Sequence, residues 1–132
     1  HPDIAENYDI DTRVYIGEID FNILMQIARL DRVYKPLPKY PAITRDIALV
    51  IKDEIYAKQV EDIIKENGEG VLEKVEMFDV YKGKQVPEGH KSIAYSLTYR
   101  AEDRTLTDDE VSSIHHKIIQ ELEKKLNARL RE

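Results

Sequence analysis

Residues 92–99 alternate between two kinds of side chain more regularly than any other stretch of the chain. One parity carries large apolar side chains and the other carries small ones: Ile93, Tyr95, Leu97 and Tyr99 against Ser92, Ala94, Ser96 and Thr98. A period of two is typical of a β-strand that buries one face. The pattern therefore predicts a sheet that is covered on one side only.

Two further strands are indicated by the same criterion. Ile47, Leu49 and Ile51 alternate with Asp46, Ala48 and Val50, and in residues 71–81 Leu72, Phe78 and Val80 share one parity. The tail at residues 128–131 has the character of a short last strand.

Two helices are predicted between these strands. Ala57, Val60, Ile63 and Ile64 recur at helical spacing before Asn67 and Gly68, which favours a helix near residues 55–67. Thr107 and Glu110 form a capping box that begins a second helix, whose apolar stripe is Val111, Ile114, Ile118, Leu122 and Leu126.

The resulting order is strand, helix, strand, strand, helix, strand. This is the split βαβ pattern of an α+β, ferredoxin-like fold, a four-stranded antiparallel sheet with two helices on one face. The helices should cover the sheet face that carries the large apolar side chains, which are Ile47, Leu49, Phe78, Val80, Ile93, Tyr95, Leu97 and Tyr99. The other face should be open, presenting Asp46, Ala48, Asp79, Tyr81, Ser92, Ala94, Ser96 and Thr98.

The open face suits RNA, because small residues let a flat base approach and a tyrosine offers a stacking surface. A merely solvated face has the same composition. Near its rim the basic residues gather: Lys82, Lys84, His90 and Lys91. Lysines are also common in exposed turns, so the pattern alone leaves both interpretations open.

A proline-rich connector at residues 34–41 divides the chain. We expect residues 36–132 to form the ferredoxin-like domain. Residues 1–35 should be the truncated end of a preceding module, with a strand at 13–20 and a short helix capped by Asp20. Because the first residue is His1, we expect the chain to be part of a larger polypeptide.

Composition excludes several classes of function. A net charge of -6 argues against a generally basic nucleic-acid binder, and the absence of cysteine excludes disulfides and thiolate metal sites. Neither a phosphate-loop motif nor a metal-spaced histidine pair occurs. The sequence therefore predicts no catalytic residues, no metal site and no cofactor in this chain. The lack of an apolar run of about 20 residues predicts no membrane span and a cytoplasmic protein.

Four ordered motifs carry a family resemblance: KYPAITRDIA at 39–48, FDVYKG at 78–83, GHKSIAY at 89–95 and RTLTD at 104–108. With Leu130-Arg131 at the end, they resemble the ferredoxin-fold anticodon-binding domain at the C-terminus of the bacterial phenylalanyl-tRNA synthetase beta chain. Residues 1–2 and 16–19 resemble the end of the catalytic-like, non-catalytic module before it.

The resemblance implies that the domain binds the anticodon region of phenylalanine tRNA within an α2β2 tetramer. Tyr81 would stack on a base, Asp79 and Ser92 would bond base edges, and Ala48 would leave room beneath the first base. Lys84 and Lys91 would meet phosphates. Aminoacylation, with ATP and magnesium, would belong to the alpha chain of the parent enzyme. Two alternatives are a small-molecule regulatory module and a purely architectural docking domain.

Overall fold

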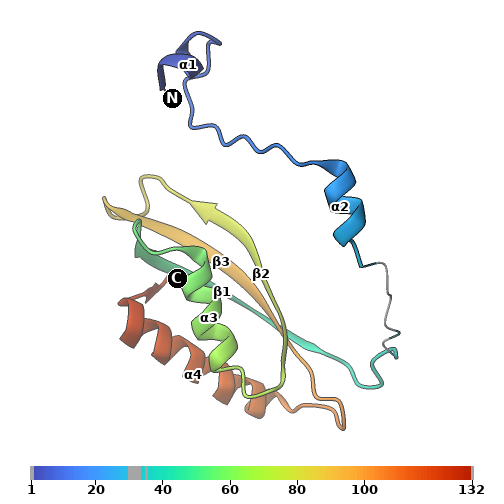
Figure 1. Cartoon of the computed structure of the whole chain (residues 1–132). Coiled ribbons are helices and arrows are strands. Elements are labelled where there is room, and N and C mark those ends of the chain that lie inside the picture. Colours follow the sequence, from blue (N-terminus) through green and yellow to red (C-terminus); the bar gives the residue numbers. More distant parts are fainter. Residues whose placement is uncertain (1, 30–33, 35, 132) are drawn as a thin grey trace. The chain divides into compact units, whose positions relative to one another are not determined.

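The computed structural model describes residues 2–29, 34 and 36–131, which are drawn in colour in Figure 1. The chain divides into two compact units, one up to Pro36 and the other from Leu37 onward. Nowhere in these ranges is there a helix long and apolar enough to cross a membrane.

In its described residues the first unit contains two short helices, α1 (Pro2–Glu6) and α2 (Phe21–Ile27). The carboxylate of Asp20 accepts hydrogen bonds from the backbone N–H groups of Asn22 (2.8 Å) and Ile23 (3.2 Å), so its predicted capping role is confirmed. The predicted strand at 13–20 is wrong: these residues form no strand, because their backbone pairs with no neighbouring strand in the described unit.

The second unit contains six elements in the predicted order: β1 (Ile43–Lys52), α3 (Ala57–Glu66), β2 (Leu72–Tyr81), β3 (His90–Tyr99), α4 (Asp108–Leu126) and β4 (Arg129–Leu130). The strands form one antiparallel sheet in the order β2-β3-β1-β4. Helices α3 and α4 lie on the same side of this sheet (Figure 1). The ferredoxin-like fold is therefore confirmed.

The core lies between the two helices and the central strands. The apolar side chains predicted to face the helices from β1 and β3 are buried. From the helices they are met by Val60, Ile64, Val111, Ile118 and Leu122. Inside this layer the Tyr95 hydroxyl donates to the carbonyl oxygen of Ala57 (3.1 Å), which ties β3 to the start of α3. Burial of these side chains supplies the main driving force for the fold.

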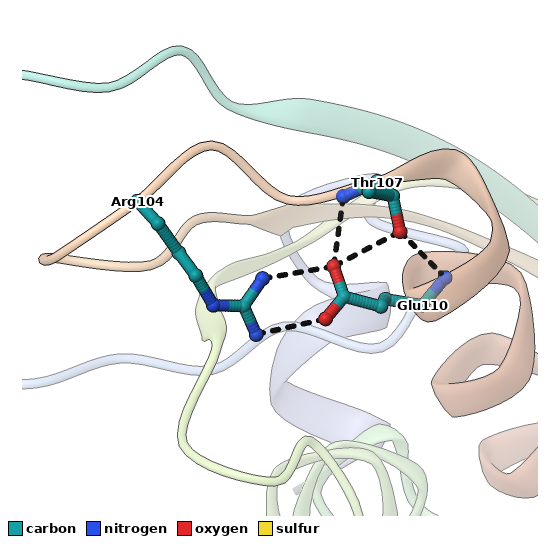
Figure 2. A network of polar contacts seen from close by, with 3 residues as sticks. All are labelled: Arg104, Thr107 and Glu110. Carbon is teal, nitrogen blue, oxygen red and sulfur yellow. Dashed lines mark hydrogen bonds and ion pairs between the residues drawn. The ribbon is translucent and has the colours of Figure 1, made fainter.

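Helix α4 begins at the predicted capping box, which gains a third member (Figure 2). The Thr107 Oγ accepts from the Glu110 N–H, while Glu110 accepts from the N–H and the hydroxyl of Thr107. The Arg104 guanidinium pairs with both carboxylate oxygens of Glu110, each at 2.8 Å. This bond and those from Thr107 lower the pKa of Glu110 to about 2.

Strand β2 departs from the predicted alternation. Register shifts between Leu72 and Lys74 and between Met77 and Asp79 interrupt its pairing with β3. Phe78, expected in the core, is 60% exposed, and Val80 is 48% exposed. The bulge removes Phe78 from the alternating pattern, and an edge strand is only partly covered by the helices. The predicted burial of these two side chains is therefore wrong.

Candidate nucleic-acid interface

The sheet register brings four predicted site residues together on the face away from the helices. Ala94 in β3 is opposite both Ala48 in β1 and Asp79 in β2, and the next residue on that face, Ser92, is opposite Tyr81. Directly opposed residues share a face, so Ala48, Asp79, Tyr81 and Ser92 form one cluster around Ala94. The bulge shifts Phe78 but keeps Asp79 and Tyr81 on this face.

This face is less open than the sequence suggested. Asp79 is exposed and Tyr81 is 36% exposed, but Ser92 is only 3% exposed and Ala94 8%. Both small residues lie outside the main core cluster, so other groups on the face away from the helices cover them. The expectation of a wholly open face is therefore wrong at Ser92 and Ala94.

Arg131 provides part of that cover. Its backbone N–H donates to the Ala48 carbonyl oxygen (2.9 Å), which continues the pairing of β4 with β1. From there its guanidinium donates to Ser92 Oγ (3.3 Å) and to Gln85 Oε1 (2.9 Å). Its Cζ lies 5.2 Å from the centroid of the Tyr81 ring, a cation–π distance. Arg131 thus contacts the cluster from the opposite edge of the sheet.

Arg131 and Arg129 were not among the site residues predicted from the sequence. Leu130 is opposite Leu49, a core residue, while Arg129 is opposite Val50, which is on the sheet face away from the helices. The basic residues on both sides of Leu130 therefore share the face of the cluster. The sequence did contain a signal for this: in a last strand paired with β1, the alternation of Arg129, Leu130 and Arg131 puts both arginines on the face opposite to that of Leu130.

The two predicted phosphate contacts differ in their surroundings. Lys84 is exposed in the loop between β2 and β3. Lys91 is opposite Ile51, a core residue, and its Nζ donates to the Asp53 carbonyl oxygen (3.0 Å). The register thus assigns Lys91 to the helix side and does not bring it to the cluster.

The Tyr81 ring lies tightly against Gly83. A Cβ atom added at Gly83 would overlap the hydroxyl oxygen and Cζ of Tyr81. Three residues on, the Val86 N–H donates to the Gly83 carbonyl oxygen (2.9 Å), and Val86 is buried. The loop therefore fixes the position of Tyr81 through a residue that has no side chain.

The cluster offers a carboxylate acceptor, an aromatic ring and a hydroxyl group around small residues. This set can stack on a base and bond its edge. Throughout the described ranges, no three His, Cys, Asp or Glu side chains are grouped to hold a metal ion. A hollow of about 340 Å³ lies at the start of α4, but its charged lining residues are already paired, Arg104 with Glu110 and Glu69 with Lys117. It does not favour the small-molecule alternative.

Comparison with known proteins identifies the family of the domain. Residues 38–131 match the model of the "Ferredoxin-fold anticodon binding domain" family. The chain is 50% identical over 131 residues to the phenylalanine–tRNA ligase beta subunit of Clostridium tetani and 49% identical to that of Clostridium acetobutylicum. It is 41% identical to the Bacillus subtilis subunit. Each match covers 99% of this chain but only 16 or 17% of the relative. The chain belongs to the family of ferredoxin-fold anticodon binding domains.

Proposed function

We propose that the domain binds the anticodon region of phenylalanine tRNA through the sheet face that carries Asp79 and Tyr81. The observation that carries the proposal is their placement: both extend from β2 on the face away from the helices, and both are accessible to solvent. The family description and the names of the relatives support the same ligand.

The roles follow from the chemistry of each group. The Tyr81 ring is a stacking surface for one base. The Asp79 carboxylate accepts from the N1 and N2 donors of guanine, and an adenine there would leave the acceptor unpaired. Ala48 has no side chain beyond Cβ and leaves space beside Ala94. Ser92 supplies a hydroxyl group for a base edge.

Overall charge does not favour tight binding by the domain alone. From residue 36 on, 16 basic residues face 19 acidic ones. Lys84 and Arg129, both exposed, are the phosphate contacts that we propose near the cluster, and Lys91 would need to leave Asp53 to join them. We therefore expect the affinity to depend on the parent enzyme.

The parent enzyme is the proposed setting for this binding. We infer that the chain is part of a cytoplasmic phenylalanine–tRNA ligase beta subunit that assembles with an alpha chain as an α2β2 tetramer. ATP and magnesium would be used by the alpha chain of that assembly, as the family resemblance implies. The contribution of this domain is binding and recognition of RNA.

We also infer that residues 1–35 belong to the module that precedes the domain. The matching relatives align with these residues as well, whereas the family model begins at residue 38. Their apolar side chains Ile16, Ile19, Phe21 and Ile27 are mostly exposed, which is expected of a surface that packs against further chain.

Titration of the 132-residue chain with an anticodon stem–loop RNA, followed by NMR chemical shifts, tests the proposal. Tyr81→Ala should weaken binding by about 1 to 3 kcal/mol, or roughly five- to 150-fold, because it removes the stacking surface. Tyr15→Ala, at an exposed tyrosine of the first unit, is the matched control and should bind as the unaltered chain does. Equal affinities for all three would favour the architectural alternative.

A further inference from the structure

The Arg131 side chain spans the face proposed for RNA. It reaches from the end of β4 to the Ser92 hydroxyl in β3, to Gln85 in the following loop and to the ring of Tyr81 in β2. Its own backbone is held by the Ala48 carbonyl oxygen. One residue therefore contacts three of the four positions assigned to base recognition.

This bridge blocks one of those positions. Ser92 is 3% exposed, and its hydroxyl already accepts from Arg131. A base edge must come within about 3 Å of Oγ to bond it. No base can do so while the guanidinium lies against the serine hydroxyl. The same bridge occupies ring surface of Tyr81 that a stacked base would use.

The bridge is made of contacts that RNA can replace. The partners of the guanidinium are a hydroxyl, an amide and an aromatic ring, all of them neutral. Among the residues that the structure describes, no carboxylate forms an ion pair with Arg131. A phosphate oxygen is a stronger acceptor for guanidinium than any neutral group, because the bond is then charge-assisted.

We propose that Arg131 is a displaceable cover of the RNA-binding face: it closes over Ser92 and Tyr81 in the free protein and moves to a phosphate when RNA enters. This inference rests on the proposed function. The observed affinity is then the intrinsic affinity multiplied by the fraction of molecules in which the cover is open. Gln85 helps to set that fraction, because it restrains the guanidinium together with Ser92 and the Tyr81 ring.

The movement can be followed by NMR on the 132-residue chain with the same stem–loop RNA. In the free protein, nuclear Overhauser effects should connect the Arg131 side chain with the Tyr81 ring. At saturating RNA these effects should disappear while the Tyr81 and Ser92 signals shift. If they persist in a complex that shifts Tyr81 and Ser92, the displaceable cover is refuted and the proposed function stands. If saturating RNA shifts other signals of the domain but neither of these two residues, both fail.

A variant tests the restraint separately. Gln85→Ala removes one acceptor of the guanidinium and should tighten RNA binding about fivefold, the effect of one hydrogen bond on the opening equilibrium. Gln120→Ala deletes the same side chain at an exposed position of α4, on the other side of the sheet, and should change nothing. An unchanged or weaker affinity for Gln85→Ala would overturn the proposal.

Discussion

The hydroxyl group of Tyr99 lies 3.0 Å from Nδ1 of His115, so the end of β3 is tied to helix α4. The two rings meet edge to face, with centroids 6.2 Å apart and an interplanar angle of 76°. Burial raises the pKa of Tyr99 to about 12, so its hydroxyl stays protonated. Burial, with the charges of Arg45 and His116, lowers the pKa of His115 below its ordinary value.

This contact predicts a loss of stability in mild acid. The unfolded chain binds a proton at His115 near pH 6.5, whereas the folded chain resists it. The free energy of unfolding should therefore fall as the pH drops below 6.5, until the folded His115 is itself protonated. Urea unfolding between pH 8 and pH 5 measures this. His115→Gln should reduce the fall, whereas His116→Gln removes only the smallest of the three causes and should keep most of it; the same fall in both would contradict the assignment.

A comparison of Phe78 in the edge strand β2 with Leu97 in the central strand β3 tests how far β2 is packed into the core. Leu97 is fully buried, and Leu97→Ala should cost about 2 to 5 kcal/mol of unfolding free energy. Phe78→Ala should cost about 1 kcal/mol or less, because most of that ring is already in water. Chemical denaturation gives both values. Equal costs would show that Phe78 belongs to the core.

Hydrogen exchange should separate the two units. Residues 13–20 form no strand, so their backbone amide hydrogens should exchange quickly. Strand β3 is paired on both sides, and its amide hydrogens should be the most protected. Native-state exchange of the 132-residue chain measures both. Equal protection would mean that residues 13–20 are held in a regular structure.

The sequence predicted those features of the fold that depend on the local pattern of side chains. The alternation of β1 and β3, the helical stripes and the Thr107–Glu110 capping box all reappear in the structure at the expected places. Each depends on residues within a few positions of one another. Strand pairing then brings Ala48, Asp79, Tyr81 and Ser92 to one face, as the parities implied.

What the sequence did not predict depends on contacts between distant segments. The bulge at Met77 is a property of the pairing of two strands, so Phe78 looked like a core residue. The cover of Ser92 requires a side chain 39 positions away in the chain. The strand expected at 13–20 had the right composition but no partner in the described unit.

Gly83 tests how the Tyr81 ring is positioned. In Gly83→Ala the new methyl group would overlap the Tyr81 hydroxyl and displace the ring. We expect RNA affinity to fall by up to the full loss of stacking, about five- to 150-fold, with little change in unfolding free energy. Gly17→Ala, which meets nothing within 4 Å, is the control. Unchanged binding by Gly83→Ala would show that the ring position is not needed.

The central claim is that this sheet face reads the anticodon, and Asp79 tests it most directly. The measurement is the aminoacylation efficiency of the complete ligase with tRNA carrying guanine or adenine as its first anticodon base, before and after Asp79→Ala. We predict that the variant loses efficiency mainly with the guanine tRNA, so that the preference for guanine falls by about 1 to 3 kcal/mol, or roughly five- to 150-fold, because the N1 and N2 donors of guanine lose their acceptor. An equal loss with both tRNAs, or no loss with either, would contradict base recognition by Asp79.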